Sequence, residues 1–463
     1  MYYDSVLKLC GYEPGEIEEQ RPRLEKAFDR LEFSPDDFER AEERLREYFD
    51  IELVGIRKML GLWIQSLVDV VLAREEGKKL VYTMMPPMVI VQNAMAMVSK
   101  DIYVTAPDIL LTYTHGAIFG NLNTITEAAE EDLLPLESCY CGGIKAKLGA
   151  VSKGLIPMPD LFVASGFVCD QTPKVDQILN ERHNVPVVYI DGTLDEEKMN
   201  WEKTSDRRVA YLVQESKDAL SKFQEVTGCT VTDEMVQEAN SRARDLRKRC
   251  KKIADLIRDA DPAVIGFDNV AAIFRAANWL VNPTTYGKTE AVIELCYTGL
   301  KERADRGEGV VAKGAPRVAV YKVCADPIVV RGIEKAGLAV IADNTGIMAP
   351  KREEYKSQYE DFWYQGIELF VRMGVGYPSR QVEFFKDLNI DGVIYNYPVG
   401  CRDQCISPVK VRDIITKELG IPVLLLEFDH VETRLYSAEV VLNRVEPFAE
   451  MLKEMKAAKA KQG

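Results

Sequence analysis

Six of the ten cysteines in this 463-residue chain are expected in or beside loops at strand ends, a placement that suits chemistry. The six are Cys139, Cys141, Cys169, Cys324, Cys401 and Cys405. Disulfides are rare inside cells, so grouped thiols without an export signal point first to metal or redox chemistry. Only three histidines are present, and an all-thiolate set suits an iron–sulfur cluster better than zinc.

The other cysteines and the histidines are expected to be structural. Four cysteines stand alone in segments with helical patterning or at a loop edge, where free cysteine is commonly a small buried hydrophobic side chain. These are Cys10, Cys229, Cys250 and Cys296. The three histidines are not paired at ligand spacing, which favours a structural or supporting role for each. They are His115, His183 and His430.

The stretch 391–415 shows how two of the thiols are positioned. Residues 392–397 are rich in β-branched and aromatic side chains and predict a buried strand, while Ser407 followed by Pro408 predicts the start of a helix. Cys401 and Cys405 then lie between the carboxyl end of the strand and the amino end of the helix. In open α/β sheets ligands bind in that crevice, and the free N–H groups of the helix favour an anionic guest such as a thiolate-ligated cluster.

The same order of features occurs around Cys169. A strand at 160–164 is followed by Cys169, by Thr172-Pro173 at a helix start, by a helix to residue 181 and by a strand near 185–190. In the later copy, a helix over 408–418 leads to a strand within 421–429. This similarity indicates an internal duplication and two similar α/β domains. Doubly wound domains bring such loops to one edge of the sheet, so cysteines far apart in sequence become neighbours.

The remaining pattern predicts four segments. Residues 1–75 read as helices, with a cap at Ser34, and residues 76–204 as the first α/β domain, with strands at 80–84, 102–105 and 109–112. Residues 205–306 are expected to be helical and to pack with the amino-terminal helices; there Thr232 caps a helix over 233–259. Residues 307–463 form the second α/β domain, in which Cys324 precedes a helix at 328–336 and a strand at 339–343.

Composition excludes several classes of protein. With 47% hydrophobic and 29% charged residues the chain is typical of a globular protein. Its net charge of −14 argues against a nucleic-acid partner. The sequence has no apolar run long enough to span a membrane and no signal peptide at its start, so we expect a cytoplasmic protein that is not bound to a membrane.

Three segments carry a family resemblance that extends over nearly the whole chain. Residues 159–170, residues 392–401 and residues 421–437 resemble the 2-hydroxyacyl-CoA dehydratase and benzoyl-CoA reductase superfamily. The resemblance implies an α-helical part, two flavodoxin-like doubly wound α/β domains and one [4Fe–4S] cluster on three cysteines. Those three would be one of Cys139 or Cys141, then Cys169, and one of Cys401 or Cys405.

The six thiols are twice the number that this three-cysteine pattern needs. The chain therefore most resembles the double-cubane cluster proteins, a branch in which two [4Fe–4S] units share a bridging sulfide as [8Fe–9S] in a homodimer. That resemblance implies an ATP-driven, low-potential reduction of small molecules, with electrons from a separate ATP-hydrolysing iron–sulfur activator. The chain has no glycine-rich phosphate loop, so ATP is expected to bind the activator.

Two other interpretations remain open at this point. One is a single three-cysteine cluster with three bystander thiols, as in a subunit of a 2-hydroxyacyl-CoA dehydratase or aryl-CoA reductase. The other is an electron carrier or a structural protein held by zinc. Several polar residues near the loops are candidates to offset cluster charge or to donate to sulfide, and are equally plausible surface or capping groups. They are Lys145, Lys147, Arg402, Lys410, Gln171 and Gln404.

Overall fold

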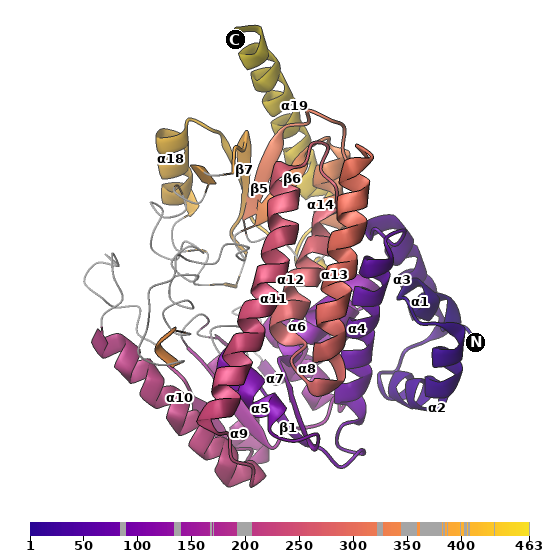
Figure 1. Ribbon diagram of the computed structural model, residues 1–463, viewed down its shortest axis with the longest axis vertical. Coiled ribbons are helices and arrows are strands. Elements are labelled where there is room, and N and C mark those ends of the chain that lie inside the picture. The colour runs from indigo at the N-terminus through magenta and orange to yellow at the C-terminus, as the bar shows by residue number, and fades with distance from the viewer. Residues whose placement is uncertain are drawn as a thin grey trace.

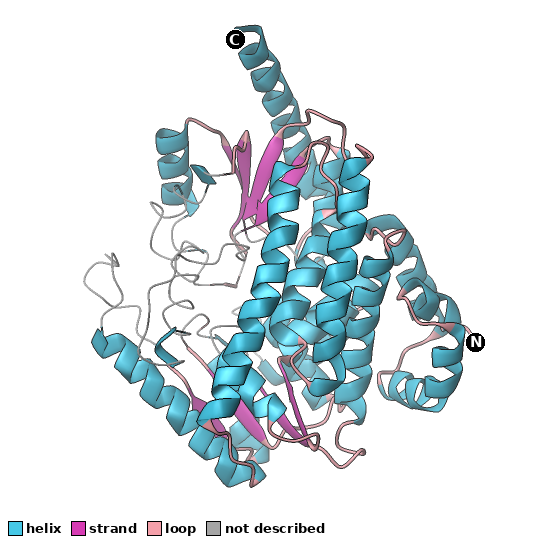
Figure 2. Ribbon diagram, in the orientation of Figure 1, coloured by secondary structure: helices cyan, strands magenta, loops and turns pink. Residues whose placement is uncertain are grey.

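Two parallel sheets lie toward opposite ends of the molecule, with long helices running between them (Figures 1 and 2). The computed structural model describes residues 1–83, 89–133, 140–166, 169, 171–191, 206–321, 327–343, 359–361, 382, 385–386, 388–398, 400–401, 405, 408–429 and 431–462. An α/β fold with two doubly wound domains and many helices is thus confirmed.

The amino-terminal region is helical, as predicted. Its helices are α1 (Asp4–Leu9), α2 (Pro14–Arg30), α3 (Pro35–Tyr48) and α4 (Val54–Leu72). The predicted cap of α3 is present: the Asp37 amide donates to Ser34 Oγ at 3.3 Å, and the Ser34 amide donates to Asp37 Oδ2 at 2.8 Å. Such reciprocal bonds satisfy two amides that the first turn of a helix leaves free.

The first α/β domain contains a four-stranded parallel sheet in the order β2-β1-β3-β4. Its strands are β1 (Lys79–Tyr82), β2 (Ile102–Thr105), β3 (Leu161–Ala164) and β4 (Val187–Tyr189). Its helices are α5 (Val89–Met97), α6 (Pro107–Leu111), the π-helix η1 (Thr112–Phe119), α7 (Asn123–Leu133), α8 (Gly142–Ser152) and α9 (Gln171–His183). Strands β1, β2 and β3 agree with the predicted segments to within two residues at each end.

The predicted strand at 109–112 is wrong. This segment forms the end of α6 and the start of the π-helix. Pro107 occupies the first turn of α6, where its fixed φ suits a helix, and a short apolar run alone does not distinguish a buried helix from a strand. Two arginines of α3 bond the carboxyl end of the π-helix: Arg40 Nε donates to the Phe119 carbonyl at 2.8 Å, and Arg44 Nε donates to that of Ala117 at 3.1 Å.

Residues 206–305 form a helical region. Its helices are α10 (Asp206–Thr227), α11 (Asp233–Asp259), α12 (Phe267–Trp279) and α13 (Pro283–Asp305). Helices α12 and α13 pack on α4. Trp63 of α4 donates its Nε1–H to the Ala272 carbonyl at 3.3 Å. A Cβ at Gly55 would stand 2.5 Å from the Cys296 nitrogen, so α4 and α13 cross in backbone contact.

Three of the four isolated cysteines are buried, in agreement with their predicted structural role. Cys10, Cys250 and Cys296 lie in the core, where burial raises the pKa of each thiol to about 12. Cys229 is half-buried. These thiols act as small apolar side chains.

The second α/β domain repeats the topology of the first. Its sheet has the order β6-β5-β7-β8, with all strands parallel. Its elements are β5 (Arg317–Tyr321), α14 (Pro327–Lys335), β6 (Ala339–Asp343), β7 (Gly392–Asn396), α18 (Pro408–Leu419), β8 (Val423–Leu426), the short 3-10 helix η4 (Thr433–Leu435) and α19 (Ala438–Gln462). In both domains the first strand pairs with the second and the third. This agrees with the two similar α/β domains that the duplicated sequence pattern predicts. The four-part division at residues 75, 204 and 306 stands as our proposal.

A buried ion network joins the second α/β domain to the helical region. The Asp50 carboxylate accepts from Arg303 of α13 at 3.2 Å, from Arg331 of α14 at 3.1 Å and from the Gly266 amide at 2.9 Å. Arg331 also pairs with Glu334 at 3.0 Å, and burial raises the pKa of Glu334 to about 7. One carboxylate thus links three segments that are distant in the sequence.

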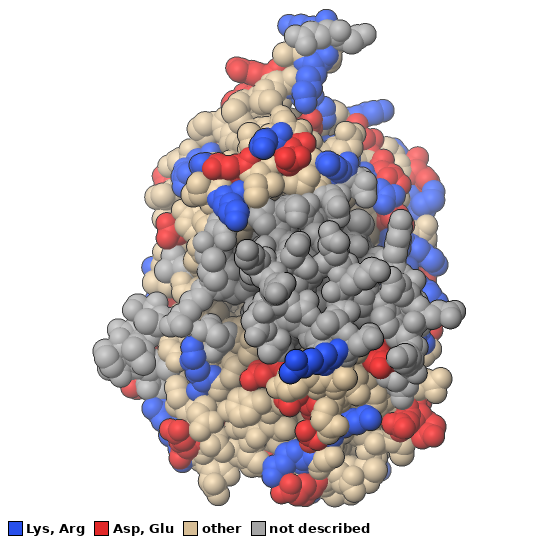
Figure 3. All heavy atoms as spheres, turned by 90° about the vertical axis from the view of Figure 1, so that its left-hand side faces the viewer, with Lys and Arg blue, Asp and Glu red and all other residues tan. Residues whose placement is uncertain are grey.

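The surface of the described residues carries mixed charge. On the face in Figure 3, lysine and arginine side chains alternate with aspartate and glutamate. Of the helices described, none has the length and apolar character needed to cross a bilayer. That the chain does not bind nucleic acid remains a prediction from its net charge.

Candidate functional site

Three of the six predicted thiols, Cys141, Cys169 and Cys401, meet where the two α/β domains touch. We call this place the junction. Gln171, two residues after Cys169, connects the three loops: its Oε1 accepts from the Cys141 amide at 3.1 Å, and its Nε2 donates to the carbonyl of Gly400. A Cβ at Gly400 would stand 3.3 Å from the Cys141 nitrogen, so the two backbones touch there. The first domain contributes two thiols and the second contributes one.

Each of these cysteines lies at an end of a regular element. Cys169 follows β3 and accepts a hydrogen bond from Thr172 Oγ1 at 3.6 Å, and Cys401 follows β7. Both therefore lie at strand ends, as predicted. Cys141 is the N-cap residue of α8, and the described elements on either side of it are the helices α7 and α8. No strand end is thus found beside Cys141 among the described residues.

The other three predicted thiols are placed differently. Cys405 lies one turn after Cys401, to whose carbonyl its amide donates at 3.1 Å, and its exposed thiol donates to the Pro398 carbonyl at 2.9 Å. Cys139 and Cys324 lie outside the described residues. So do Arg402, Gln404 and His430.

Asp429, which follows β8, fixes the turn that carries Cys141. Its buried carboxylate accepts from the Gly142 amide at 3.2 Å and from the amides of Val431 at 2.9 Å and Glu432 at 2.8 Å. A Cβ at Gly142 would stand 2.7 Å from Val431 Cγ2, so only glycine fits beside the thiol without displacement. In the sequence, an aspartate follows the last strand of each of the two similar segments, and Asp429 is the second of these. Its contact with the Cys141 turn was not predicted.

The electrostatics of the junction favour a guest that carries positive metal ions. Burial raises the pKa of the Cys141 thiol well above its usual range, and the neighbouring Asp429, Cys169 and Cys401 raise it further. Burial also raises the pKa of Cys169. Three thiolates beside a buried carboxylate repel one another unless cations lie between them. Iron supplies those cations, and soft thiolates are its usual ligands in clusters, so the residues present fit an iron–sulfur cluster.

A single zinc ion and an iron–sulfur cluster make different demands on their ligands. A single zinc ion needs all its sulfur ligands at about 2.3 Å, whereas in a cubane each thiolate binds its own iron. Among the described residues, no three His, Cys, Asp or Glu side chains are close enough together to hold one metal ion.

Two of the three candidate lysines pair with carboxylates. Lys145 pairs with Glu130 at 2.9 Å and with the buried Glu432 at 3.1 Å, and Lys147 pairs with the buried Asp176. Both ammonium groups are buried, so they are neither surface groups nor helix caps. Lys410 is exposed on α18.

His115 is structural. It is buried in the π-helix with its ring 5.0 Å from that of Phe33, and burial lowers its pKa to about 3. It is therefore neutral at physiological pH. His183, at the end of α9, is exposed.

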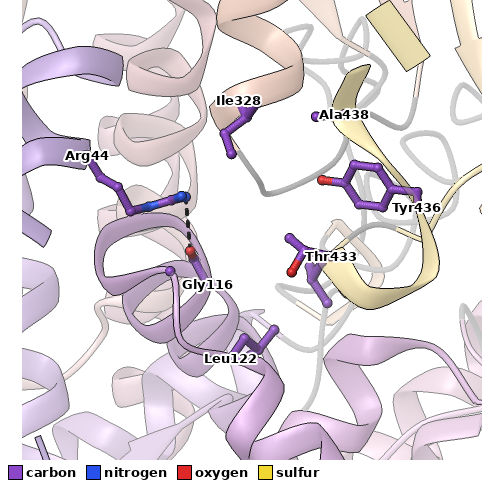
Figure 4. Close-up of a pocket in the computed structure, with 9 residues that line it drawn as sticks. Arg44, Gly116, Leu122, Ile328, Thr433, Tyr436 and Ala438 are labelled. Atoms are coloured by element: carbon purple, nitrogen blue, oxygen red, sulfur yellow. Dashed lines mark hydrogen bonds between the residues drawn. The ribbon is translucent and has the colours of Figure 1, made fainter. Parts of the chain in front are cut away.

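A cavity of about 210 Å³ is lined in part by the 431–438 segment (Figure 4). Arg44, Leu122, Ile328, Thr433 and Tyr436 contribute to its wall. Val431 also lines it and reaches the space beside Gly142, so the cavity and the Cys141 turn share this segment. The described lining contains no thiol.

Replacing Gln171 with glutamate is expected to loosen the junction. A carboxylate has no N–H to donate to the Gly400 carbonyl, and leaving a buried polar group unsatisfied costs about 1–3 kcal/mol. We expect the anaerobic protein to lose iron to a chelator about tenfold faster. Gln237→Glu, on the exposed face of α11, is the matched control and is expected to lose iron at the wild-type rate. Equal rates for the two variants would show that Gln171 does not hold the loops together.

Comparison with known proteins finds one matching family model and two relatives, and all three are named as CoA dehydratases. A family model described as 2-hydroxyglutaryl-CoA dehydratase, D-component, matches residues 87–452. The chain is 21% identical over 317 residues to the alpha subunit of (R)-2-hydroxyglutaryl-CoA dehydratase from Acidaminococcus fermentans, a match that covers 66% of this chain and 63% of that subunit. It is 18% identical over 310 residues to the alpha subunit of (R)-2-hydroxyisocaproyl-CoA dehydratase from Clostridioides difficile, with coverage of 65% and 73%.

The chain thus spans less than two thirds of the first of these subunits. The family match is broader, since it begins in the first α/β domain and ends within α19, and so includes Cys141, Cys169 and Cys401. The chain belongs to the 2-hydroxyglutaryl-CoA dehydratase D-component family.

Proposed function

We propose that this chain is a component of a 2-hydroxyacyl-CoA dehydratase or aryl-CoA reductase that holds one [4Fe–4S] cluster on Cys141, Cys169 and Cys401. The observation that carries the proposal is the junction itself, where Gln171 connects three loops that each bear one thiol. This set matches the three-cysteine pattern of the superfamily. Both named relatives are dehydratase alpha subunits, which supports the same reaction class.

The bound cluster would supply one-electron chemistry at the one iron that has no thiolate. The chain's own residues would hold it in place: Asp429 orients the turn with Cys141, Thr172 donates to Cys169, and Gln171 sets the distance between domains. Electrons would come one at a time from an ATP-hydrolysing iron–sulfur activator, as family membership implies. A CoA thioester is the proposed substrate class.

A second candidate is the double-cubane reductase, with [8Fe–9S] bound by all six thiols in a homodimer and a small molecule as substrate. Its support in the structure is Cys405, whose thiol lies one helical turn from Cys401. A second cubane would also require Cys139 and Cys324, which lie outside the described residues. The three-cysteine proposal needs only Cys141, Cys169 and Cys401, and the bonds of Gln171 to two of their loops support it, so it is preferred.

The iron content distinguishes the two candidates. One cubane per chain gives about four irons and four acid-labile sulfides, whereas the double cubane gives about eight irons. We expect about four after anaerobic purification, together with binding of an acyl-CoA. About eight irons in a homodimer without affinity for CoA would favour the double cubane, and zinc in place of iron would contradict both.

A further inference from the structure

Three charged side chains are buried together beneath the cysteine loops. Asp108 of α6, Lys147 of α8 and Asp176 of α9 are 3%, 1% and 2% exposed. Lys147 donates to Asp176, so this pair fastens α8 to α9. Cys141 is the N-cap residue of α8, and α9 begins two residues after Cys169. We call these three residues the buried triad.

The buried triad has one acid more than it can neutralise. One ammonium faces two carboxylates, so with both acids ionised the cluster of charges is negative by one, at side chains that are no more than 3% exposed. Lys147 serves Asp176 directly, whereas Asp108 Oδ1 has no hydrogen-bond partner among the described residues. Asp108 is therefore the acid better suited to take up a proton.

The titration of Asp108 agrees with this geometry. Burial raises its pKa to about 6; the charge of Lys147 acts to lower it and that of Asp176 to raise it. The π-helix also packs against α6, and it brings Tyr113 and His115, whose own pKa values are shifted mainly by burial. Thus the charges that act most strongly on Asp108 belong to the triad.

Asp108 and the thiol site act on each other. Asp108 lies on α6, which packs against α8, the helix that Cys141 caps. Burial is the main cause of the raised pKa of Cys169, and the negative charge of Asp108 adds to it. By the same interaction, negative charge at the thiol site raises the affinity of Asp108 for a proton. An electron added at the site increases that negative charge. The buried triad thus lies where it responds to the redox state.

We propose that Asp108 takes up a proton from water when the site gains an electron, so that reduction and protonation are coupled. This inference rests on the proposed cluster. The electron comes from a low-potential one-electron donor, and the proton forms an O–H bond on the Asp108 carboxylate, so the net charge of the junction is unchanged. Asp108 thus compensates the charge of the added electron, and it needs no contact with the substrate to do so.

The test is a redox titration of the anaerobic holoprotein between pH 5.5 and 8.5, with titanium(III) citrate as the electron donor. Coupling makes the midpoint potential fall as the pH rises, because removing the proton destabilises the reduced state. The limit is a tenfold change in the equilibrium constant per pH unit, or about 59 mV for one electron. The slope is expected above about pH 6, where Asp108 is ionised before reduction.

The Asp108→Asn variant is expected to show a flat profile. The matched control is Glu334→Gln, which alters a buried carboxyl whose pKa burial raises to about 7 but which lies in the Asp50 network, and it should keep the wild-type slope. A flat wild-type profile would overturn the inference without any variant, as would a wild-type slope in Asp108→Asn. If the wild-type protein assembles no iron–sulfur cluster, the proposed function fails, and the proton coupling fails with it.

Discussion

Serine in place of Cys169 is expected to leave the purified protein with less than about a tenth of the wild-type iron, and Cys141→Ser and Cys401→Ser should have the same effect. With only three thiolates on one cubane, losing one frees a second iron and leaves two loops to hold the cluster. A serine hydroxyl is a poor substitute, because soft thiolates are the ligands that clusters prefer. Iron and sulfide analysis with visible absorbance, after anaerobic purification, measures the effect.

Two further cysteine variants make this result specific. Cys229→Ser changes an isolated, half-buried thiol and should retain the full iron content. Cys405→Ser separates the two candidate functions: it should leave the iron unchanged if one cubane is bound, and should remove about half of it if two are bound. Full iron content in Cys169→Ser would contradict every cluster hypothesis for this chain.

Asp50→Ala is expected to lower the free energy of unfolding by about 3–5 kcal/mol, the usual cost of removing one partner from a buried ion network. Arg303 and Arg331 would remain in a site where their side chains are only 8% and 14% exposed. Each would keep its other carboxylate partner, Glu52 or Glu334, but the one that they share would be lost. The Gly266 amide would lose its acceptor as well. Chemical denaturation of the full chain gives the value.

The control for this prediction is Asp245→Ala on α11. Asp245 pairs with Lys248 at 3.2 Å, but both side chains are more than half exposed. Exposed pairs contribute about 0–1 kcal/mol, so this variant should unfold close to the wild type. If Asp50→Ala were equally mild, the network would not be what joins the second α/β domain to the helices.

Local patterns explain the parts of the fold that the sequence predicts well. The helix over 233–259 agrees with α11 at both ends, because Thr232 caps its start and Pro262 follows its end. Both cysteine loops at strand ends follow from the short apolar runs before them, Leu161–Ala164 and Gly392–Asn396. The duplicated order of strand, loop and helix predicts two similar α/β domains, and the two sheets have the same strand order.

Contacts between distant segments account for what the sequence does not show. The π-helix depends on Arg40 and Arg44, which come from α3 and bond its carboxyl end. The carboxylate partner of Lys147 lies on another helix, and Gln171 reaches a carbonyl in the other domain. Nothing in the neighbouring residues specifies such partners, since they are chosen by packing.

The junction also sets the order in which the site can be made. Two of its thiols precede residue 170, while Cys401 belongs to the second domain. A ribosome adds about 5–20 residues per second, so roughly 10 to 50 s pass between the emergence of Cys169 and that of Cys401. During that interval the first domain carries two exposed ligands of an unfinished site. Insertion of the proposed cluster would therefore have to wait until translation has nearly ended, and a chain truncated before β7 would lack Cys401.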